Sequence, residues 1–114
     1  QAKTLDLYAP LPTEPRLQQM AQSILQHPQQ RIRLSTWAPR FACRERALAR
    51  HIQMLTGSNF RRWRQQLLVL LALQKLGEGH AVKRIASDLG YESPSALIAL
   101  FKQIVGVTPG QFQL

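Results

Sequence analysis

Apolar residues recur three and four positions apart over the first half of the chain, which is the spacing of amphipathic helices. The first helix is expected from about Pro15 to Leu25, because proline suits a first helical position and the apolar pattern follows it directly. A second, shorter helix is expected from about Leu34 to Phe41, and Pro39 interrupts its last turn. Two helices are therefore predicted ahead of Glu45.

A third helix is expected from about Glu45 to Leu55. Leu48, Ile52 and Leu55 form its apolar stripe, and we expect all three to be buried. Gly57 follows the last turn and is well placed to end the helix in a left-handed conformation. The second and third helices together predict a helix-turn-helix unit.

The fourth segment predicts a longer helix from Asn59, a good N-cap residue, to about Leu76. Its run from Leu67 to Leu73 is apolar on nearly every side, so protein must cover it from several directions. At 1.5 Å per residue this helix is about 26 Å long, enough to connect two packed subdomains. The apolar stripe within it consists of Phe60, Trp63, Leu67, Leu70 and Leu71.

After this connector the first pattern returns, which indicates an internal repeat. With a shift of 48 residues, Leu34, Trp37, Ala38 and Ala42 match Val82, Ile85, Ala86 and Gly90. With a shift of 49, Leu48, Ile52, Gly57 and Asn59 match Leu97, Phe101, Gly106 and Thr108. The repeat predicts a second helix-turn-helix unit.

The second unit should contain a helix from about Pro94 to Ile104 with Ser93 as its cap, and a last short helix capped by Thr108 with Pro109 first. The predicted fold is all-α, with about seven helices in two helix-turn-helix subdomains joined by a long connector. We expect residues 1–12 to be a linker from a missing N-terminal domain and 13–114 to be one domain, divided into 13–57, the connector 59–76, and 80–114.

The charge balance points to a polyanionic partner. The 114 residues include 15 Lys and Arg against 6 Asp and Glu, a net charge of +9, while the hydrophobic fraction of 45% is that of a folded domain. Between Arg31 and Arg64 there are nine arginines and a single acid, Glu45. The first unit should therefore dominate the electrostatics.

Catalytic machinery is not visible in the sequence. Paired carboxylates, a glycine-rich phosphate loop and a nucleophile elbow are all missing, and no Cys and His pair has metal-ligand spacing. The lone Cys43 excludes an internal disulfide, and the longest apolar stretch is too short to cross a bilayer. We expect a cytoplasmic protein that is not an enzyme and uses no metal or cofactor.

The third helix carries the best candidates for reading DNA bases. Arg46, Ala49, Arg50 and Gln53 lie opposite its apolar stripe on a helical wheel. The planar fork of arginine can donate two hydrogen bonds to guanine in the major groove. The other arginines of this region are interpreted as phosphate contacts or bystanders: Arg31, Arg33, Arg40, Arg44, Arg61, Arg62 and Arg64.

The corresponding helix of the second unit has smaller outward residues. Ser95 could donate to a base, while Ala96 and Ala99 could touch a thymine methyl group; Ser93 and Lys102 could reach phosphate. The alternative is that this helix only packs against the rest of the protein.

Two rival functions remain for the whole chain: a basic helical adaptor that binds an acidic protein, and non-specific RNA binding, which the lack of exposed aromatic residues among the basic residues disfavours.

Two blocks, LSTWAPRFACRERALARHIQMLTG and VKRIASDLGYESPSALIALFKQIVGVTPGQF, resemble the helix-turn-helix units of the AraC/XylS family of bacterial transcription regulators. The resemblance covers about Pro15 to Phe112, and its most specific part is the run Gly106, Val107, Thr108 and Pro109 with Phe112 following. The chain departs from the family pattern at three positions: Arg33 for a Ser or Thr cap, Pro39 for Ala, and Ala99 for a frequent Arg.

The resemblance implies sequence-specific binding to double-stranded DNA, with two recognition helices in successive major grooves about 34 Å apart. It places Arg46, Ala49 and Arg50 at the base-reading positions of the first unit. In the second unit these positions hold Pro94, Ser95, Ala96 and Ala99. We also expect RNA polymerase as a partner, a nucleoid location, a monomeric isolated domain and a full-length protein that dimerises through its missing sensing domain.

Overall fold

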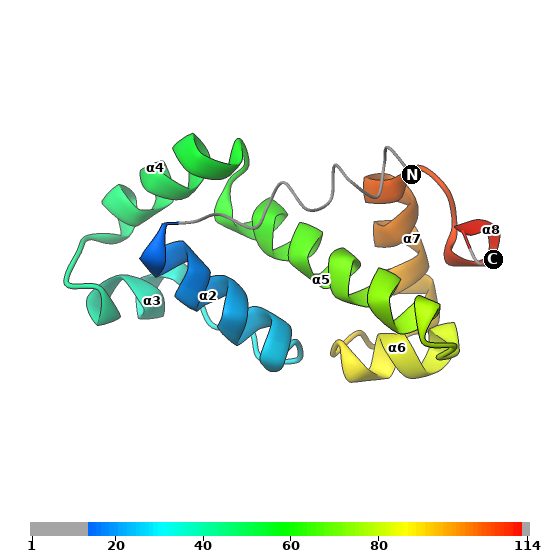
Figure 1. Ribbon diagram of the computed structural model, residues 1–114. Coiled ribbons are helices and arrows are strands. Elements are labelled where there is room, and N and C mark those ends of the chain that lie inside the picture. Colours follow the sequence, from blue (N-terminus) through cyan, green and yellow to red (C-terminus); the bar gives the residue numbers. More distant parts are fainter. Residues whose placement is uncertain (1–13, 113–114) are drawn as a thin grey trace.

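The computed structural model describes residues 14–112, and this part of the chain consists of seven helices without a strand (Figure 1). The helices are α2 (Pro15–Gln26), α3 (Leu34–Arg40), α4 (Glu45–Thr56), α5 (Phe60–Gly77), α6 (Val82–Asp88), α7 (Pro94–Val105) and α8 (Pro109–Phe112). The all-α prediction is confirmed, and the observed helices follow the predicted ones closely. The predicted linker over residues 1–12 lies outside the described residues.

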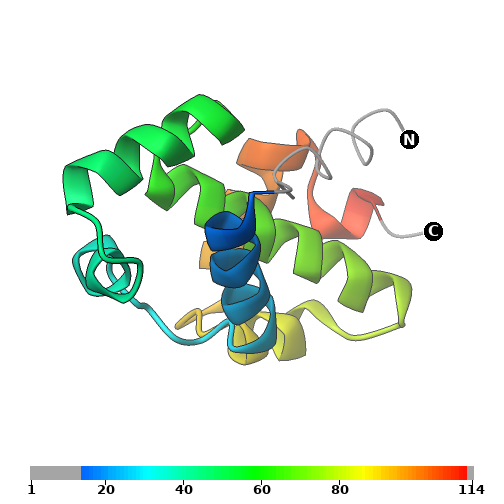
Figure 2. The same cartoon turned by 60° about the vertical axis from the view of Figure 1, so that its left-hand side comes forward.

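The connector α5 runs through the middle of the domain, with α2 to α4 on one side and α6 to α8 on the other (Figure 1). It packs against α2 and α4 of the first unit and against α6 and α7 of the second. Within the units α3 packs on α4, α6 on α7, and α8 on α7. The domain is elongated, with extents of 43 × 29 × 20 Å, and Figure 2 shows α2 lying across α5, against which it packs.

The predicted helix ends are formed by the residues that the sequence pattern indicated. The side-chain oxygen of Asn59 accepts a hydrogen bond from the backbone N–H of Arg62 at 2.8 Å, and the hydroxyl of Ser93 accepts one from the first turn of α7 at 3.4 Å. Gly57 and Gly106 end α4 and α7 with φ values of 76° and 96°. Only glycine adopts this left-handed conformation without steric cost.

The internal repeat is visible in the backbone of the two turns. Ala42, between α3 and α4, has φ 53°, and its match Gly90, between α6 and α7, has φ 84°. In each turn the next residue donates its backbone N–H to a carbonyl of the preceding helix, Cys43 at 3.1 Å and Tyr91 at 2.9 Å. The two units therefore share one backbone turn, although only the second uses glycine.

One continuous core joins the two units. Its largest fully buried side chains are Trp37 in the first unit, Trp63 in the connector and Phe101 in the second unit. The connector is buried on several sides, as its composition predicted, although Leu70 and Leu71 of the predicted stripe are only partly buried. The residues of α5 that are buried are Trp63, Leu67, Leu68, Val69, Ala72, Leu73 and Leu76.

Two expectations for the first unit were wrong. Leu55 was expected in the core, but its side chain is 49% exposed and its neighbour Met54 is 72% exposed, because the buried residues of α4 end at Ile52 and its last turn lies beyond the core. Pro39 was expected to interrupt the second helix, but α3 continues to Arg40. The helix tolerates Pro39 because this residue lies in the last turn. The helix ends there with a hydrogen bond of the 3₁₀ type, in which the backbone N–H of Phe41 donates to the carbonyl of Ala38, three residues earlier, at 3.1 Å.

Candidate nucleic-acid interface

The outward face of α4 carries the residues that were predicted to read bases. Arg46, Arg50 and Gln53 are exposed and Ala49 is half-buried, while Leu48 and Ile52 on the opposite face are fully buried. This separation follows from the helical period, which places the two sets on opposite sides. The face therefore offers two guanidinium groups and one amide to a groove of suitable width.

A hydrogen bond connects the first turn of α2 to α4. Arg16 Nη2 donates to His51 Nδ1 at 2.6 Å, and the same nitrogen pairs with Glu14 Oε2 at 3.0 Å. Because the arginine side chain can only donate, Nδ1 of His51 is the acceptor in this hydrogen bond. No sequence pattern predicts this contact, because its partners lie 35 residues apart and neither belongs to an apolar pattern.

Glu14 is ionised more easily than an ordinary glutamate. Burial alone would raise the pKa of its carboxyl, but hydrogen bonds from the side chain and backbone of Arg16, together with the Arg16 charge and the backbone N–H of Leu17, hold the pKa below its usual value. The carboxylate also caps α2 by accepting from Arg16 N–H. Glu14 thus fixes both the start of α2 and the position of Arg16.

The candidate phosphate contacts of the first unit lie around its turn and at the start of α5. Arg33 and Arg44 are the exposed N-cap residues of α3 and α4. The guanidinium of Arg40 lies 4.9 Å from the ring centroid of Trp37, a cation–π contact that holds this charge in place. On the first turn of α5, Arg61 is exposed and Arg62 is half-buried.

The outward face of α7 is small and uncharged at its start. Its exposed residues Ser95, Ala96 and Ala99 lie opposite Leu97 and Phe101, which are buried. The cap residue Ser93 and Lys102 near the end of the helix are also exposed. All the predicted site residues of the second unit therefore reach the surface, whereas Ile98 of the same helix is half-buried.

A direct contact joins the two units beside the connector, and we call it the seam. The loop after α2 contributes Gln29 and Arg31, and the turn after α6 contributes Leu89, Gly90 and Tyr91. Arg31 Nη2 donates to the carbonyl of Leu89 at 2.9 Å, and its Cζ lies 5.6 Å from the Tyr91 ring centroid. In both views this loop runs beside the end of α6 (Figure 1, Figure 2).

Positive charge is concentrated next to the seam. Arg64 on α5 is half-buried; loss of hydration lowers the pKa of its guanidinium, and repulsion from Arg31 and Arg61 lowers it further. Burial raises the pKa of Tyr91, while the charges of Arg31 and Arg64 act in the opposite direction. Arginine nevertheless stays protonated at any physiological pH, so these guanidinium groups form a permanent positive cluster.

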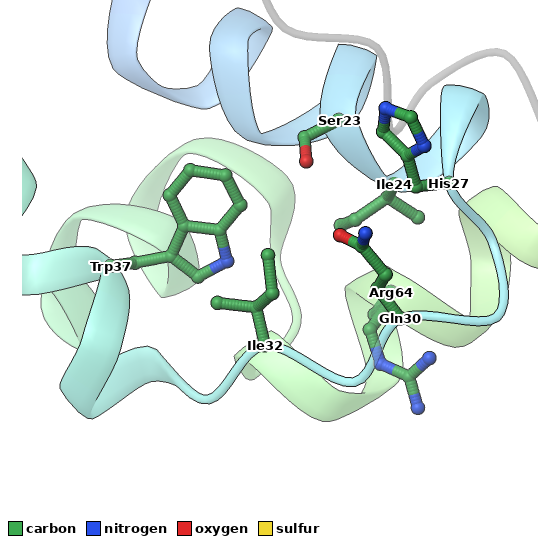
Figure 3. A pocket seen from close by; sticks show the side chains of 7 residues that line it. All are labelled: Ser23, Ile24, His27, Gln30, Ile32, Trp37 and Arg64. Atoms are coloured by element: carbon green, nitrogen blue, oxygen red, sulfur yellow. The ribbon is translucent and has the colours of Figure 1, made fainter.

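A small hollow lies between α2, α3 and α5 (Figure 3). Its lining consists of Ser23, Ile24, His27, Gln30, Ile32, Trp37 and Arg64. Trp37 Nε1 and Arg64 Nη1 are buried and have no hydrogen-bond partner among the described residues. The lining holds no carboxylate, and no group of three or more His, Cys, Asp or Glu within residues 14–112 could hold a metal ion.

Residues 37–114 match the family described as a helix-turn-helix domain. This match spans more than half of the chain and includes both turns, the connector and both outward-facing helices. The chain belongs to the AraC-type helix-turn-helix family. The resemblance that the sequence motifs indicated is thereby confirmed.

Relatives of this helix-turn-helix domain include transcription regulators. The HTH-type transcriptional regulator NimR of Escherichia coli strain K12 is 42% identical over 106 residues, which cover 93% of this chain and 39% of NimR. The DNA-binding domain of the global transcriptional factor AdpA, solved in complex with a target DNA, is 28% identical with a TM-score of 0.71; the likeness covers 88% of this chain and 90% of that one.

The fold recurs in more distant proteins. ToxT from Vibrio cholerae shares it with a TM-score of 0.74 at 16% identity, over 85% of this chain and 37% of ToxT. This helix-turn-helix domain therefore spans less than half the length of NimR and of ToxT. Of the helices described, none combines the length and apolar character that crossing a lipid bilayer requires.

Proposed function

We propose that this domain binds double-stranded DNA sequence-specifically for a bacterial transcription regulator, with α4 and α7 in successive major grooves. The observation that carries the proposal is the face of α4. It presents Arg46, Arg50 and Gln53 to solvent while Leu48 and Ile52 anchor the helix in the core. A major groove accommodates one such helix, and these side chains match the edges of its bases.

The chemistry of base reading follows from these side chains. Arg46 and Arg50 can each donate two hydrogen bonds to O6 and N7 of a guanine, and Gln53 can pair with N6 and N7 of an adenine. A good pair of this kind contributes about 1–3 kcal/mol of discrimination, or about 5- to 150-fold in affinity. The half-buried methyl group of Ala49 can touch a thymine methyl group.

The second unit reads less of the DNA sequence in this proposal. The hydroxyl of Ser95 is the one polar group among its exposed base-reading candidates, and Ala96 and Ala99 can offer only methyl contacts. The family position that often holds an arginine is occupied here by Ala99. We therefore expect α7 to contribute position and affinity more than sequence choice.

Phosphate contacts supply the affinity that does not depend on sequence. The residues proposed for this role are exposed or half-buried at the edges of the two helix-turn-helix units: Arg33, Arg40, Arg44, Arg61, Arg62, Ser93 and Lys102. Each Lys or Arg that neutralises a phosphate steepens the salt dependence of the binding constant by about 0.9 on a double logarithmic scale. Binding should therefore weaken steeply as salt rises.

The comparisons support this proposal over the adaptor and RNA alternatives. A relative with 28% identity is a domain solved on its target DNA, and NimR is a transcriptional regulator by name. For the whole protein we propose RNA polymerase as a partner, a dimer, a cytoplasmic location on the nucleoid, and no enzymatic activity. The isolated domain should bind as a monomer.

Selection from a random library of duplexes at about 150 mM salt, followed by sequencing, tests the proposal, because this salt concentration suppresses contacts that depend on charge alone. We expect a block that contains guanine and a second, weaker block about ten base pairs away, one turn of DNA. In a repeat selection with Arg50→Ala, the preference at one position of the first block should fall by about 5- to 150-fold.

Arg61→Ala is the matched control, because it also removes one guanidinium but from the proposed phosphate set. It should weaken all duplexes by a similar factor and lower the salt slope by about 0.9. If wild-type protein enriches no sequence, specific DNA binding is wrong. If Arg50→Ala and Arg61→Ala both weaken every duplex equally, base reading by α4 is wrong.

A further inference from the structure

The seam gives the two units a second connection besides α5. Its partners are far apart in the chain, since Arg31 and Leu89 are separated by 58 residues. If α5 were the sole connection, the units could rotate relative to each other about the axis of this helix. A second contact beside α5 restricts that rotation. The seam is therefore placed where it can fix the angle between the units.

The contacts of Arg31 suit a rigid brace. One terminal nitrogen donates to the carbonyl of Pro28 in its own loop, and the other donates to the carbonyl of Leu89 in the second unit. The flat guanidinium also lies over the ring of Tyr91. A lysine carries the same charge, but its single nitrogen has neither the fixed fork nor the flat face, so it cannot reproduce this geometry.

Gly90 makes the seam a close backbone contact. A Cβ atom at this position would lie 3.0 Å from Cα and 3.1 Å from Cβ of Gln29, and 3.2 Å from Nη2 of Arg31. The nearest of these atoms belongs to the backbone, so it cannot move aside as the end of a side chain would. A side chain at position 90 would therefore require the loop after α2 to shift by a few tenths of an ångström.

We propose that Arg31, with Tyr91 and Gly90, sets the separation of the two DNA-reading helices and thus the spacing between DNA blocks that the domain accepts. This inference rests on the proposed DNA binding. When two binding modules are held at a fixed distance, the second binds at a high effective concentration only if its site lies at that distance. Arg31 is thus a positioning residue, whose guanidinium contacts other parts of the protein and not a DNA phosphate.

Duplexes in which the two selected blocks are separated by eight to thirteen base pairs, together with a duplex that carries the first block alone, test this role. Binding constants are measured by fluorescence anisotropy for the whole domain. We expect wild-type protein to favour one spacing near ten base pairs, about one helical turn. In Arg31→Lys the advantage of that spacing over its neighbours should fall about tenfold, while binding to the single block stays within twofold.

Two control variants separate positioning from other roles. Arg33→Ala removes an exposed charge from the same loop and should weaken all duplexes equally, with the spacing profile unchanged. Tyr91→Phe keeps the ring below the guanidinium and should retain the wild-type profile. Arg31→Lys retains the charge and most of the side chain, so it tests the geometry even if Arg31→Ala does not fold.

Each outcome decides between the two proposals. If wild-type protein selects no DNA sequence, the proposed function fails and the role of Arg31 fails with it. If wild-type protein has a sharp spacing optimum that Arg31→Lys leaves unchanged, only the positioning role is wrong. If Arg31→Lys weakens the single block as much as the double blocks, Arg31 is a phosphate contact and the seam does not set the spacing.

Discussion

Replacement of Gly90 by alanine tests how closely the backbones of the two units are packed at the seam. Gly90 has φ 84°, a conformation that costs an L-residue about 1–2 kcal/mol. Alanine also lowers the entropy of the unfolded chain, which stabilises the folded state by about 0.4–1 kcal/mol. The net backbone cost of the substitution is therefore near 1 kcal/mol. The added methyl group must also displace the Gln29 backbone from 3.0 Å, and overpacking of this kind costs about 1–3 kcal/mol. The expected total loss is about 2–4 kcal/mol.

Gly79→Ala is the matched control for this experiment. Its φ of 89° is close to that of Gly90, but a Cβ there would meet nothing within 4 Å. It should therefore show the backbone cost of about 1 kcal/mol without the packing cost. Urea unfolding followed by circular dichroism gives both free energies. Equal losses in the two variants would show that the seam yields without resistance, and the argument for a rigid contact would then be refuted.

Two further predictions concern α4 and α2. Ile52→Val should lower the free energy of unfolding by about 0.5–1.5 kcal/mol, because this side chain is fully buried. Leu55→Ala should change the free energy of unfolding by less than about 0.5 kcal/mol, because this side chain is exposed. A larger loss in Leu55→Ala would mean that Leu55 is covered. Glu14→Gln retains the cap oxygen but removes the charge, so at pH 7 it should cost about 0.2–1 kcal/mol, typical of a solvated pair. Because the folded-state pKa of Glu14 is lowered, its stabilisation is present above the unfolded value of about 4.3 and lost as pH falls through the folded value. Urea unfolding at a series of pH values from 7 downward should show the difference closing in acid; a deficit of the same size at every pH would show that charge is not its cause.

Local features of the chain were predictable because their causes are local. The caps at Asn59 and Ser93 and the left-handed end at Gly57 depend on residues within one helical turn. The repeat correctly matched Ala42 with Gly90, since one turn backbone serves both units. Periodicity also separated the outward arginines of α4 from its buried face.

The remaining features depend on distances that periodicity does not contain. A helical wheel shows which side of α4 faces inward, but it does not show where the neighbouring helices stop, so Leu55 was wrongly placed in the core. Arg16 and His51 are 35 residues apart, and Arg31 reaches Leu89 across 58. Such contacts arise only after the helices have packed. Their polar partners leave no periodic pattern in the sequence.

The position of α5 also bears on how this chain folds and how it can be divided. Since the same helix supplies buried side chains to both halves, neither half has a complete core without it. We therefore regard the domain as one cooperative folding unit, in which the loss of either half leaves an apolar side of α5 in water and favours aggregation of the fragment. Exchange of one half between related proteins would succeed only where the borrowed half fits the matching side of α5.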